Sequence, residues 1–200
     1  MVKRYEQNEI KEMAEILRND GVLSVPTDTV YGLCARMDSE NAEENLREVK
    51  NRPATKAFPI MCADLDQIRT IAEVDETAEK IIRAFMPGPL TVILRKKENI
   101  PAYVNGGQDT LAIRMATSDA LRKLIEELGC PVFMTSANQS GEKTAETLDE
   151  IEQACPKLAG MMKGETKFGK ASTILNCAGD LRVLREGPIQ MEEIQALLHQ

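Results

Sequence analysis

The sequence has one histidine, no tryptophan and no closely spaced pair of cysteines. Because the histidine, His199, is the penultimate residue, a Ser-His-Asp triad, a Cys-His pair and histidine metal sites are excluded. The five cysteines form no CxxC pair, and their odd number argues against a disulfide framework or a thiolate zinc site. Any chemistry must therefore use cations, hydroxyls, amides and carboxylates, and we expect no resident metal.

Long apolar runs are also missing. No stretch approaches the roughly 18–20 apolar residues that a membrane span needs. The N-terminal segment MVKRYEQNEIKEM lacks the apolar centre of a signal peptide. We therefore expect a cytoplasmic protein with no membrane contact. Asp and Glu number 32 against 25 Lys and Arg, which argues against a broad nucleic-acid-binding surface.

The composition that remains is typical of a folded domain. The 200 residues are 42% hydrophobic and 28% charged, which excludes disordered and fibrous proteins. Apolar spacing predicts helices at 8–19, 40–50, 78–85, 121–128 and 191–198, with a short helix near Thr147. Short apolar runs predict strands at 22–26, 57–63, 90–94, 110–114, 130–134, 172–176 and 181–185. We expect one α/β domain over residues 1–200, with a mixed sheet because some consecutive strands have no helix between them.

Polar residues crowd the segment PTDTVYGL (26–33), which follows the first buried strand. Ligands of open α/β sheets usually bind where a strand ends, so Thr29 and its neighbours form a candidate site. The alternative is a turn that begins at Pro26, with Gly32 supplying a permissive backbone. On these residues alone the two interpretations have equal weight.

A concentration of cations occupies REVKNRPATK (47–56). Arg47, Lys50, Arg52 and Lys56 stand there against one acid, Glu48. Cations at a helix C-terminus or on a solvated face would explain part of this. In an acidic protein the same cluster suits a polyphosphate, which arginine grips bidentately and lysine holds as a point charge.

The loop TSANQSG (135–141), directly after a predicted strand, supplies hydroxyls, an amide and free backbone N–H groups. Ser136 and Asn138 could belong to a backbone nest for phosphate or to a turn that satisfies itself. It is not a P-loop, because no GxxxxGK[ST] occurs in the chain. Arg114, Ser172 and Arg185 also stand at strand ends, where salt bridges or an edge hydroxyl are the simpler explanations.

The chain resembles the YrdC-like threonylcarbamoyl-AMP synthases in seven segments that occur in family order. They are PTDTVYGL (26–33), KNRP (50–53), PGPLT (87–91), DTLAIR (109–114), TSANQSG (135–141), STIL (172–175) and LREGP (184–188). The resemblance spans residues 22–188 and is closest to the short, single-domain form. It implies a YrdC-like fold, with a twisted mixed β-sheet, flanking helices and a large, positively lined cleft.

The resemblance also implies a role for each matching residue. Those expected to act in catalysis are Lys50, Arg52, Ser136 and Asn138. Those expected to contact ATP are Arg52, Lys56, Thr110, Ser136, Thr144 and Arg185. Those expected to contact threonine are Thr29, Arg114, Met134 and Ser172. Two positions depart from the family pattern, Met61 where a histidine is frequent and Ala116 where a proline is usual.

The activity implied by the resemblance is L-threonylcarbamoyladenylate synthesis, a nucleotidyltransferase reaction. ATP, L-threonine and bicarbonate would give threonylcarbamoyl-AMP and pyrophosphate, the first step of N6-threonylcarbamoyladenosine formation in tRNA. We expect Mg²⁺ with ATP, no organic cofactor, and downstream threonylcarbamoyl-transferase proteins as partners. The substrate supplies the nucleophile, so alignment and charge neutralisation at the phosphates suffice and no histidine is needed.

Three other functions remain open from the sequence. The basic segment 47–56 could serve a non-enzymatic RNA-binding module that contacts tRNA or double-stranded RNA. Seven Phe and Tyr residues offer few stacking platforms for it. A carbamoyl-transfer domain like that of hydrogenase-maturation proteins would be expected with zinc-finger segments, and a structural role leaves the strand-end cations unexplained.

Overall fold

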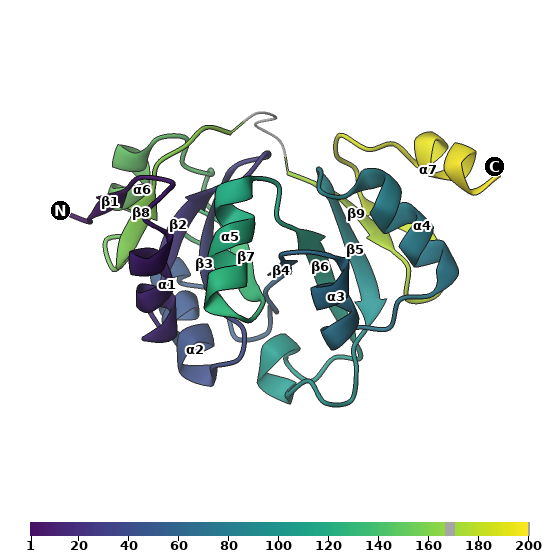
Figure 1. The fold of residues 1–200 in the computed structure, drawn as a ribbon, viewed down its shortest axis with the longest axis horizontal. Coiled ribbons are helices and arrows are strands. Elements are labelled where there is room, and N and C mark those ends of the chain that lie inside the picture. Colours follow the sequence, from purple (N-terminus) through teal and green to yellow (C-terminus); the bar gives the residue numbers. More distant parts are fainter. Residues whose placement is uncertain (167–170, 200) are drawn as a thin grey trace.

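The computed structural model describes residues 1–166 and 171–199, and it contains a twisted ten-stranded sheet flanked by helices (Figure 1). The strands are β1 (Arg4–Tyr5), β2 (Leu23–Pro26), β3 (Tyr31–Arg36), β4 (Ile60–Cys62), β5 (Leu90–Arg95), β6 (Thr110–Met115), β7 (Val132–Ser136), β8 (Gly160–Met162), β9 (Thr173–Asn176) and β10 (Arg182–Arg185). The helices are α1 (Ile10–Arg18), α2 (Glu40–Lys50), α3 (Leu65–Ile71), α4 (Glu76–Phe85), α5 (Asp119–Leu128), α6 (Leu148–Ala154) and α7 (Met191–Leu198), with a 3₁₀ turn at Ala102–Asn105. No helix in the described ranges is long and apolar enough to cross a membrane.

The sheet is mixed, as the sequence predicted. Its strand order is β1-β8-β2-β3-β7-β4-β6-β5-β9-β10. The β4–β6 and β5–β9 pairs are parallel, whereas β3–β7, β5–β6 and β9–β10 are antiparallel. Segments far apart in sequence therefore meet at the centre of the sheet.

Two hydrophobic cores cover the two faces of the sheet. Along β4 the side chains alternate, so that Ile60 and Cys62 join one core and Met61 joins the other. The core that contains Met61 packs under α1 and α5, which lie side by side in Figure 1. The other core packs under α2, α3, α4, α6 and α7. This alternation follows from the period of two in a strand.

Helix ends explain much of the local structure. The side chains of Ser39, Asp64, Asp75 and Ser118 each accept a backbone N–H in the first turn of the helix that follows. Thr147 forms a full capping box with Glu150, as its spacing predicted. A cap of this kind stabilises a helix by about 1 kcal/mol.

The expectation for residues 26–33 needs one correction. Only residues 27–30 form a turn, and Tyr31 begins β3. Gly32 is required for close packing and not for an unusual backbone conformation, because a Cβ at this position would stand 2.4 Å from Met134 Sδ. Strands β1, β3 and β8 and helix α3 were not predicted, and the strand expected at 57–63 is confined to Ile60–Cys62.

Candidate functional site

A cavity of about 830 Å³ opens on the sheet face that also carries α1 and α5. Its floor is one transverse row of side chains on five strands, Met61, Arg114, Thr91, Ile174 and Arg185. The pairs Met61↔Arg114, Thr91↔Ile174 and Arg185↔Ile174 are in register, and the β5–β6 register sets Thr91 opposite Arg114. The site is therefore built by strand order, which joins residues that are up to 124 positions apart.

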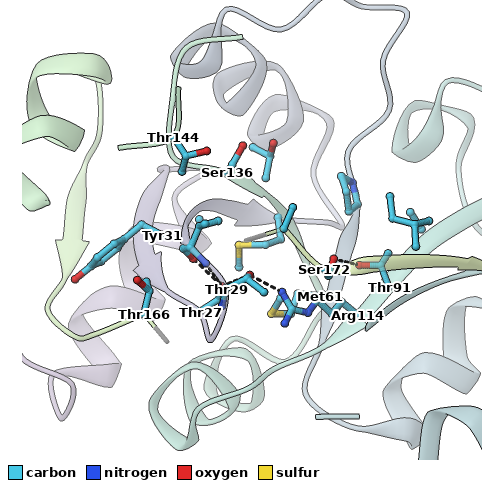
Figure 2. Close-up of a pocket in the computed structure, with 18 of the residues that line it drawn as sticks. Thr27, Thr29, Tyr31, Met61, Thr91, Arg114, Ser136, Thr144, Thr166 and Ser172 are labelled. Carbon is cyan, nitrogen blue, oxygen red and sulfur yellow. Dashed lines mark hydrogen bonds between the residues drawn. The ribbon is translucent and has the colours of Figure 1, made fainter. Parts of the chain in front are cut away.

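Arg114 is buried in this row, between Met61 and Thr91. Its Nε and Nη2 donate to Gly88 O at 3.1 and 2.8 Å, and Nη1 donates to Thr29 Oγ1 at 2.9 Å. Nη2 also forms an ion pair with the Asp28 carboxylate. The salt bridge that was the simpler explanation for Arg114 is thus present, and Figure 2 shows Thr29 and Arg114 joined by a hydrogen bond.

The turn at residues 27–30 is held by its own hydroxyls. Thr27 Oγ1 donates to Val30 O at 2.6 Å and accepts the backbone N–H groups of Thr29 and Val30 at 3.2 and 3.3 Å. It lies 3.0 Å from Thr29 Oγ1. Thr29 is thereby fixed between Thr27 and Arg114, with its side chain at the cavity wall.

At the other end of the row, Ser172 and Arg185 hold each other. Arg185 Nε and Nη2 donate to Ser172 O at 3.0 and 2.8 Å, and Nη2 reaches Ser172 Oγ at 3.2 Å. The hydroxyls of Ser172 and Thr91 lie 2.8 Å apart (Figure 2). Arg185 makes no ion pair within the described residues, so the salt bridge that would explain it structurally is not found.

Lys50 lies behind the loop 135–141 and does not line the cavity. Its Nζ donates to Ser136 O at 2.7 Å, Asn138 Oδ1 at 2.9 Å and Asn138 O at 3.1 Å. Ser136 Oγ donates to Asn138 Oδ1 at 2.6 Å, and Asn138 Nδ2 donates to Gln139 O and Glu142 O. The loop therefore satisfies many of its own polar groups while it presents Ser136 to the cavity.

Arg52 reaches the cavity wall from the basic segment. Its guanidinium lies 4.9 Å above the ring of Phe58 and donates to Lys56 O at 3.1 Å and Ala57 O at 2.7 Å. A solvated face does not explain the whole segment 47–56, because Val49 and Lys50 are buried.

Burial lowers the pKa of four cations here, and three of them, unlike Arg114, form no ion pair among the described residues. It lowers the pKa of Lys50 to about 8, with help from the charge of Arg52. It also lowers the pKa of Arg52, with help from Arg47, and that of Arg185. A cation that is costly to bury and has no carboxylate partner is stabilised by an incoming anion. The electrostatics of the cavity thus favour a negatively charged ligand.

Eight of the residues to which the resemblance gave a functional role line this one cavity: Thr29, Arg52, Arg114, Met134, Ser136, Thr144, Ser172 and Arg185. Lys50 stands behind the loop, Asn138 lies within the loop but outside the lining, and Lys56 is exposed outside the lining. Thr110 shares the sheet face of Arg114 but lies beyond the lining, four residues along β6. The stretch KFGKA (167–171) falls outside the described residues except for Ala171, which lines the cavity.

The sequence did not identify every residue at the site. Asp28, Thr91, Lys143 and Thr166 received no role, although the segments PTDTVYGL and PGPLT contain the first two. In the part of the chain that the structure describes, no three His, Cys, Asp or Glu residues gather as metal ligands. The lining carries the cations Arg52, Arg114, Lys143 and Arg185 and the acid Glu146.

Known proteins resemble this chain over most of its length. A family model that covers the Sua5, YciO and YrdC proteins, described as "Telomere recombination", matches residues 15–187. A threonylcarbamoyl-AMP synthase of Pyrococcus abyssi is 36% identical over 98% of this chain, which spans 59% of that protein. A putative threonylcarbamoyl-AMP synthase of Methanocaldococcus jannaschii is 34% identical, over 97% of this chain and 96% of the relative.

Two solved structures share the fold. The P. abyssi Sua5 structure complexed with L-threonine has a TM-score of 0.91 at 32% identity, over 99% of this chain and 61% of that one. Escherichia coli YciO has a TM-score of 0.85 at 26% identity, over 97% and 100% of the two chains. The chain spans 59% and 56% of the first two curated relatives, from P. abyssi and Bacillus subtilis.

Proposed function

Because the chain belongs to the Sua5/YciO/YrdC family, we propose that it is a threonylcarbamoyl-AMP synthase. The reaction would convert ATP, L-threonine and bicarbonate into threonylcarbamoyl-AMP and pyrophosphate. The observation that carries this proposal is a cavity with two groups of polar side chains. Arg114, Thr29 and Ser172 form one group, and Arg52, Ser136 and Thr144 form the other.

The first group suits the amino acid. Arg114 offers a guanidinium to a carboxylate, and the hydroxyls of Thr29 and Ser172 stand nearby. Sites that hydrogen-bond a substrate hydroxyl discriminate far better than apolar pockets against an analogue without it. We therefore assign threonine to this end of the cavity, and Met61 and Met134 provide its apolar wall.

The second group suits the nucleotide. Ser136 and Thr144 lie together in Figure 2, apart from Thr91, Arg114 and Ser172. Arg52 and Lys143 bring positive charge to the lining, and Arg185 lies at the threonine end, where the two substrates would meet. Mg²⁺ would enter as the counter-ion of ATP, and its ligands would be phosphate oxygens.

The proposed chemistry needs alignment more than an activated side chain. The threonine amine would combine with bicarbonate, with loss of water, to form an N-carboxylate. One oxygen of that carboxylate would attack the α-phosphorus while the bond to pyrophosphate breaks. Neutralising charge on the phosphates and holding the two reactants in line are the protein's contributions. The product would pass to a transferase that modifies tRNA.

The proposal predicts pyrophosphate release that needs threonine and bicarbonate together. Purified protein would be mixed with ATP and Mg²⁺, and each of the other two substrates would be withheld in turn. Release above background should appear only in the complete mixture, since the N-carboxylate is the nucleophile. Valine in place of threonine is the matched control, because it has the same shape without the hydroxyl. Equal release with valine would contradict the assignment of Thr29 and Ser172.

Arg52→Ala should raise the KM for ATP roughly tenfold to a hundredfold, because a hydrogen bond to a charged group contributes about 1.5–3 kcal/mol of binding energy. The KM for threonine should change little, because Arg52 is outside the threonine group. Arg69→Ala, which removes an arginine of the exposed α3 surface, is the control. An unchanged KM for ATP would remove Arg52 from the site, and unfolding in circular dichroism would assign it a structural role.

A further inference from the structure

Arg47 belongs to the basic segment 47–56, but it is not among the described residues that line the cavity. Its Nη2 forms an ion pair with the carboxylate of Glu43, one helical turn earlier on α2, and its Nε donates to the same carboxylate at 3.4 Å. The two side chains are 20% and 8% exposed. Because Glu43 already holds this guanidinium and balances its charge, Arg47 is poorly placed to hold a phosphate itself.

The remaining nitrogen of Arg47 holds the loop that follows α2. Its Nη1 donates to Pro53 O at 2.6 Å and to Lys56 O at 3.3 Å. The backbone N–H of Lys56 donates to Pro53 O at 3.1 Å, so the two carbonyls belong to one turn. The side chains of residues 53–56 are exposed, so the contacts with Arg47 are what join this turn to the helix.

The same loop orients Arg52, which does line the cavity. Arg52 Nε donates to Lys56 O at 3.1 Å, and Nη2 donates to Ala57 O at 2.7 Å. The Lys56 carbonyl therefore accepts from both arginines. The two guanidiniums also share the buried ring of Phe58, whose centre lies 5.1 Å from that of Arg47 and 4.9 Å from that of Arg52.

The donors left on Arg52 match a phosphate group. A guanidinium has five N–H groups, and two of those on Arg52 go to backbone carbonyls. Both Nη1 hydrogens and one Nη2 hydrogen remain, and Nη1 and Nη2 together form an edge that can bind two phosphate oxygens. The direction of this edge is set by the carbonyls at the opposite edge, and Arg47 holds one of those carbonyls.

We propose that Arg47 is a positioning residue for ATP, because it fixes the loop and shares the ring that together orient Arg52. The inference rests on the function proposed above and deepens it. If Arg47 acted only as an attractive charge, lysine would replace it without loss. Lysine cannot replace it in positioning, because an ammonium lacks the planar fork that meets the Glu43 carboxylate and two carbonyls at once.

The test measures the Kd of labelled ATP, with Mg²⁺, by equilibrium dialysis. In Arg47→Lys the Kd should rise about tenfold, the lower end of the range expected for loss of Arg52, because Arg52 remains but is no longer held in one direction. Partial unfolding would lower the number of binding sites instead and leave the Kd of the folded protein unchanged. The number of sites and the Kd therefore separate a structural role from a positioning role.

Arg36→Lys is the matched control. Arg36 also pairs with a carboxylate, that of Asp38, and donates to a backbone carbonyl, that of Arg18, but it lies outside the cavity lining. Its replacement should leave the Kd for ATP unchanged.

An Arg52→Ala background shows whether Arg47 acts through Arg52. There, Arg47→Lys should change the Kd by less than twofold, because the residue that it positions is gone. A tenfold rise that persists in this background would overturn the inference, and so would a Kd within twofold of the unmodified protein in folded Arg47→Lys. Either result would leave the proposed function standing, which fails instead if the unmodified protein binds no ATP.

Phe58→Leu tests the shared ring and decides alone if Arg47→Lys does not fold. It should raise the Kd for ATP about threefold, since one cation–π contact is lost from Arg52. Phe85→Leu is its control, because Phe85 packs against the same core and has no cation over its ring within the described ranges. In that case an unchanged Kd in folded Phe58→Leu would overturn the inference.

Discussion

Arg114→Ala is expected to abolish most threonine-dependent pyrophosphate release and to destabilise the protein at the same time. Removing one partner of a buried, hydrogen-bonded charge pair costs about 2–5 kcal/mol in ligand binding, so kcat/KM for threonine should fall roughly a hundredfold to a thousandfold. The stability loss should be about 3–5 kcal/mol, because Asp28 would be left as an unpaired buried carboxylate. Both changes come from one side chain and can be measured separately.

A double variant separates the two effects. Asp28→Asn combined with Arg114→Ala leaves no stranded charge, so much of the lost stability should return in thermal melting. Activity should not return, because no guanidinium remains for the threonine carboxylate. If the double variant melts as low as Arg114→Ala alone, the ion pair does not explain the stability. If Arg114→Ala keeps a normal KM for threonine, the carboxylate binds elsewhere.

Lys50→Met should impair the use of ATP although Lys50 does not line the cavity. The variant leaves Ser136 O, Asn138 O and Asn138 Oδ1 without the ammonium that joins them. Ser136 O and Asn138 Oδ1 keep other donors, whereas Asn138 O would be left unsatisfied, so we expect a stability loss of about 1–3 kcal/mol. The loop would then hold Ser136 loosely, and kcat/KM for ATP should fall about a hundredfold, as misplacement of a binding group permits.

The pH profile distinguishes this role of Lys50 from a passive one. Burial lowers the pKa of Lys50 to about 8, so the ammonium is charged below that pH and loses its proton above it. In the unmodified protein kcat/KM for ATP should therefore decline as the pH rises through about 8. Lys50→Met should lack this decline. Lys157→Met, at an exposed lysine paired with Glu48, is the matched control and should retain it. A decline that persists in Lys50→Met would assign it to another group.

The residues that line the site could be predicted from the sequence, but the way in which the fold brings them together could not. Motif order indicated Arg114, Ser136 and Ser172, and the structure brings all three to one cavity. That convergence depends on the order β4-β6-β5-β9-β10, which local apolar patterns do not specify. Helices with strong periodicity, such as α1 and α5, were predicted because one face of each must be buried.

Three features depend on long-range packing and could not be predicted from the sequence. The direction of the Lys50 side chain depends on a loop more than 80 positions away. The ion pair of Asp28 forms only because strand β6 places Arg114 beside it. Strand β3 was not predicted, because the segment 26–33 was left open between a ligand site and a turn in which Gly32 supplied a permissive backbone, whereas that glycine is needed for close contact with Met134. In each case tertiary contacts decide the role of a residue whose local preference is neutral.

The most direct measurement follows the bicarbonate carbon into the product. The protein would be incubated with ATP, Mg²⁺, L-threonine and ¹³C-labelled bicarbonate, and the quenched mixture would be analysed by mass spectrometry. The account predicts an adduct of threonine and AMP that carries one labelled carbon, formed in a one-to-one ratio with pyrophosphate. A threonine–AMP adduct without the label, or ATP converted to ADP and phosphate, would contradict it.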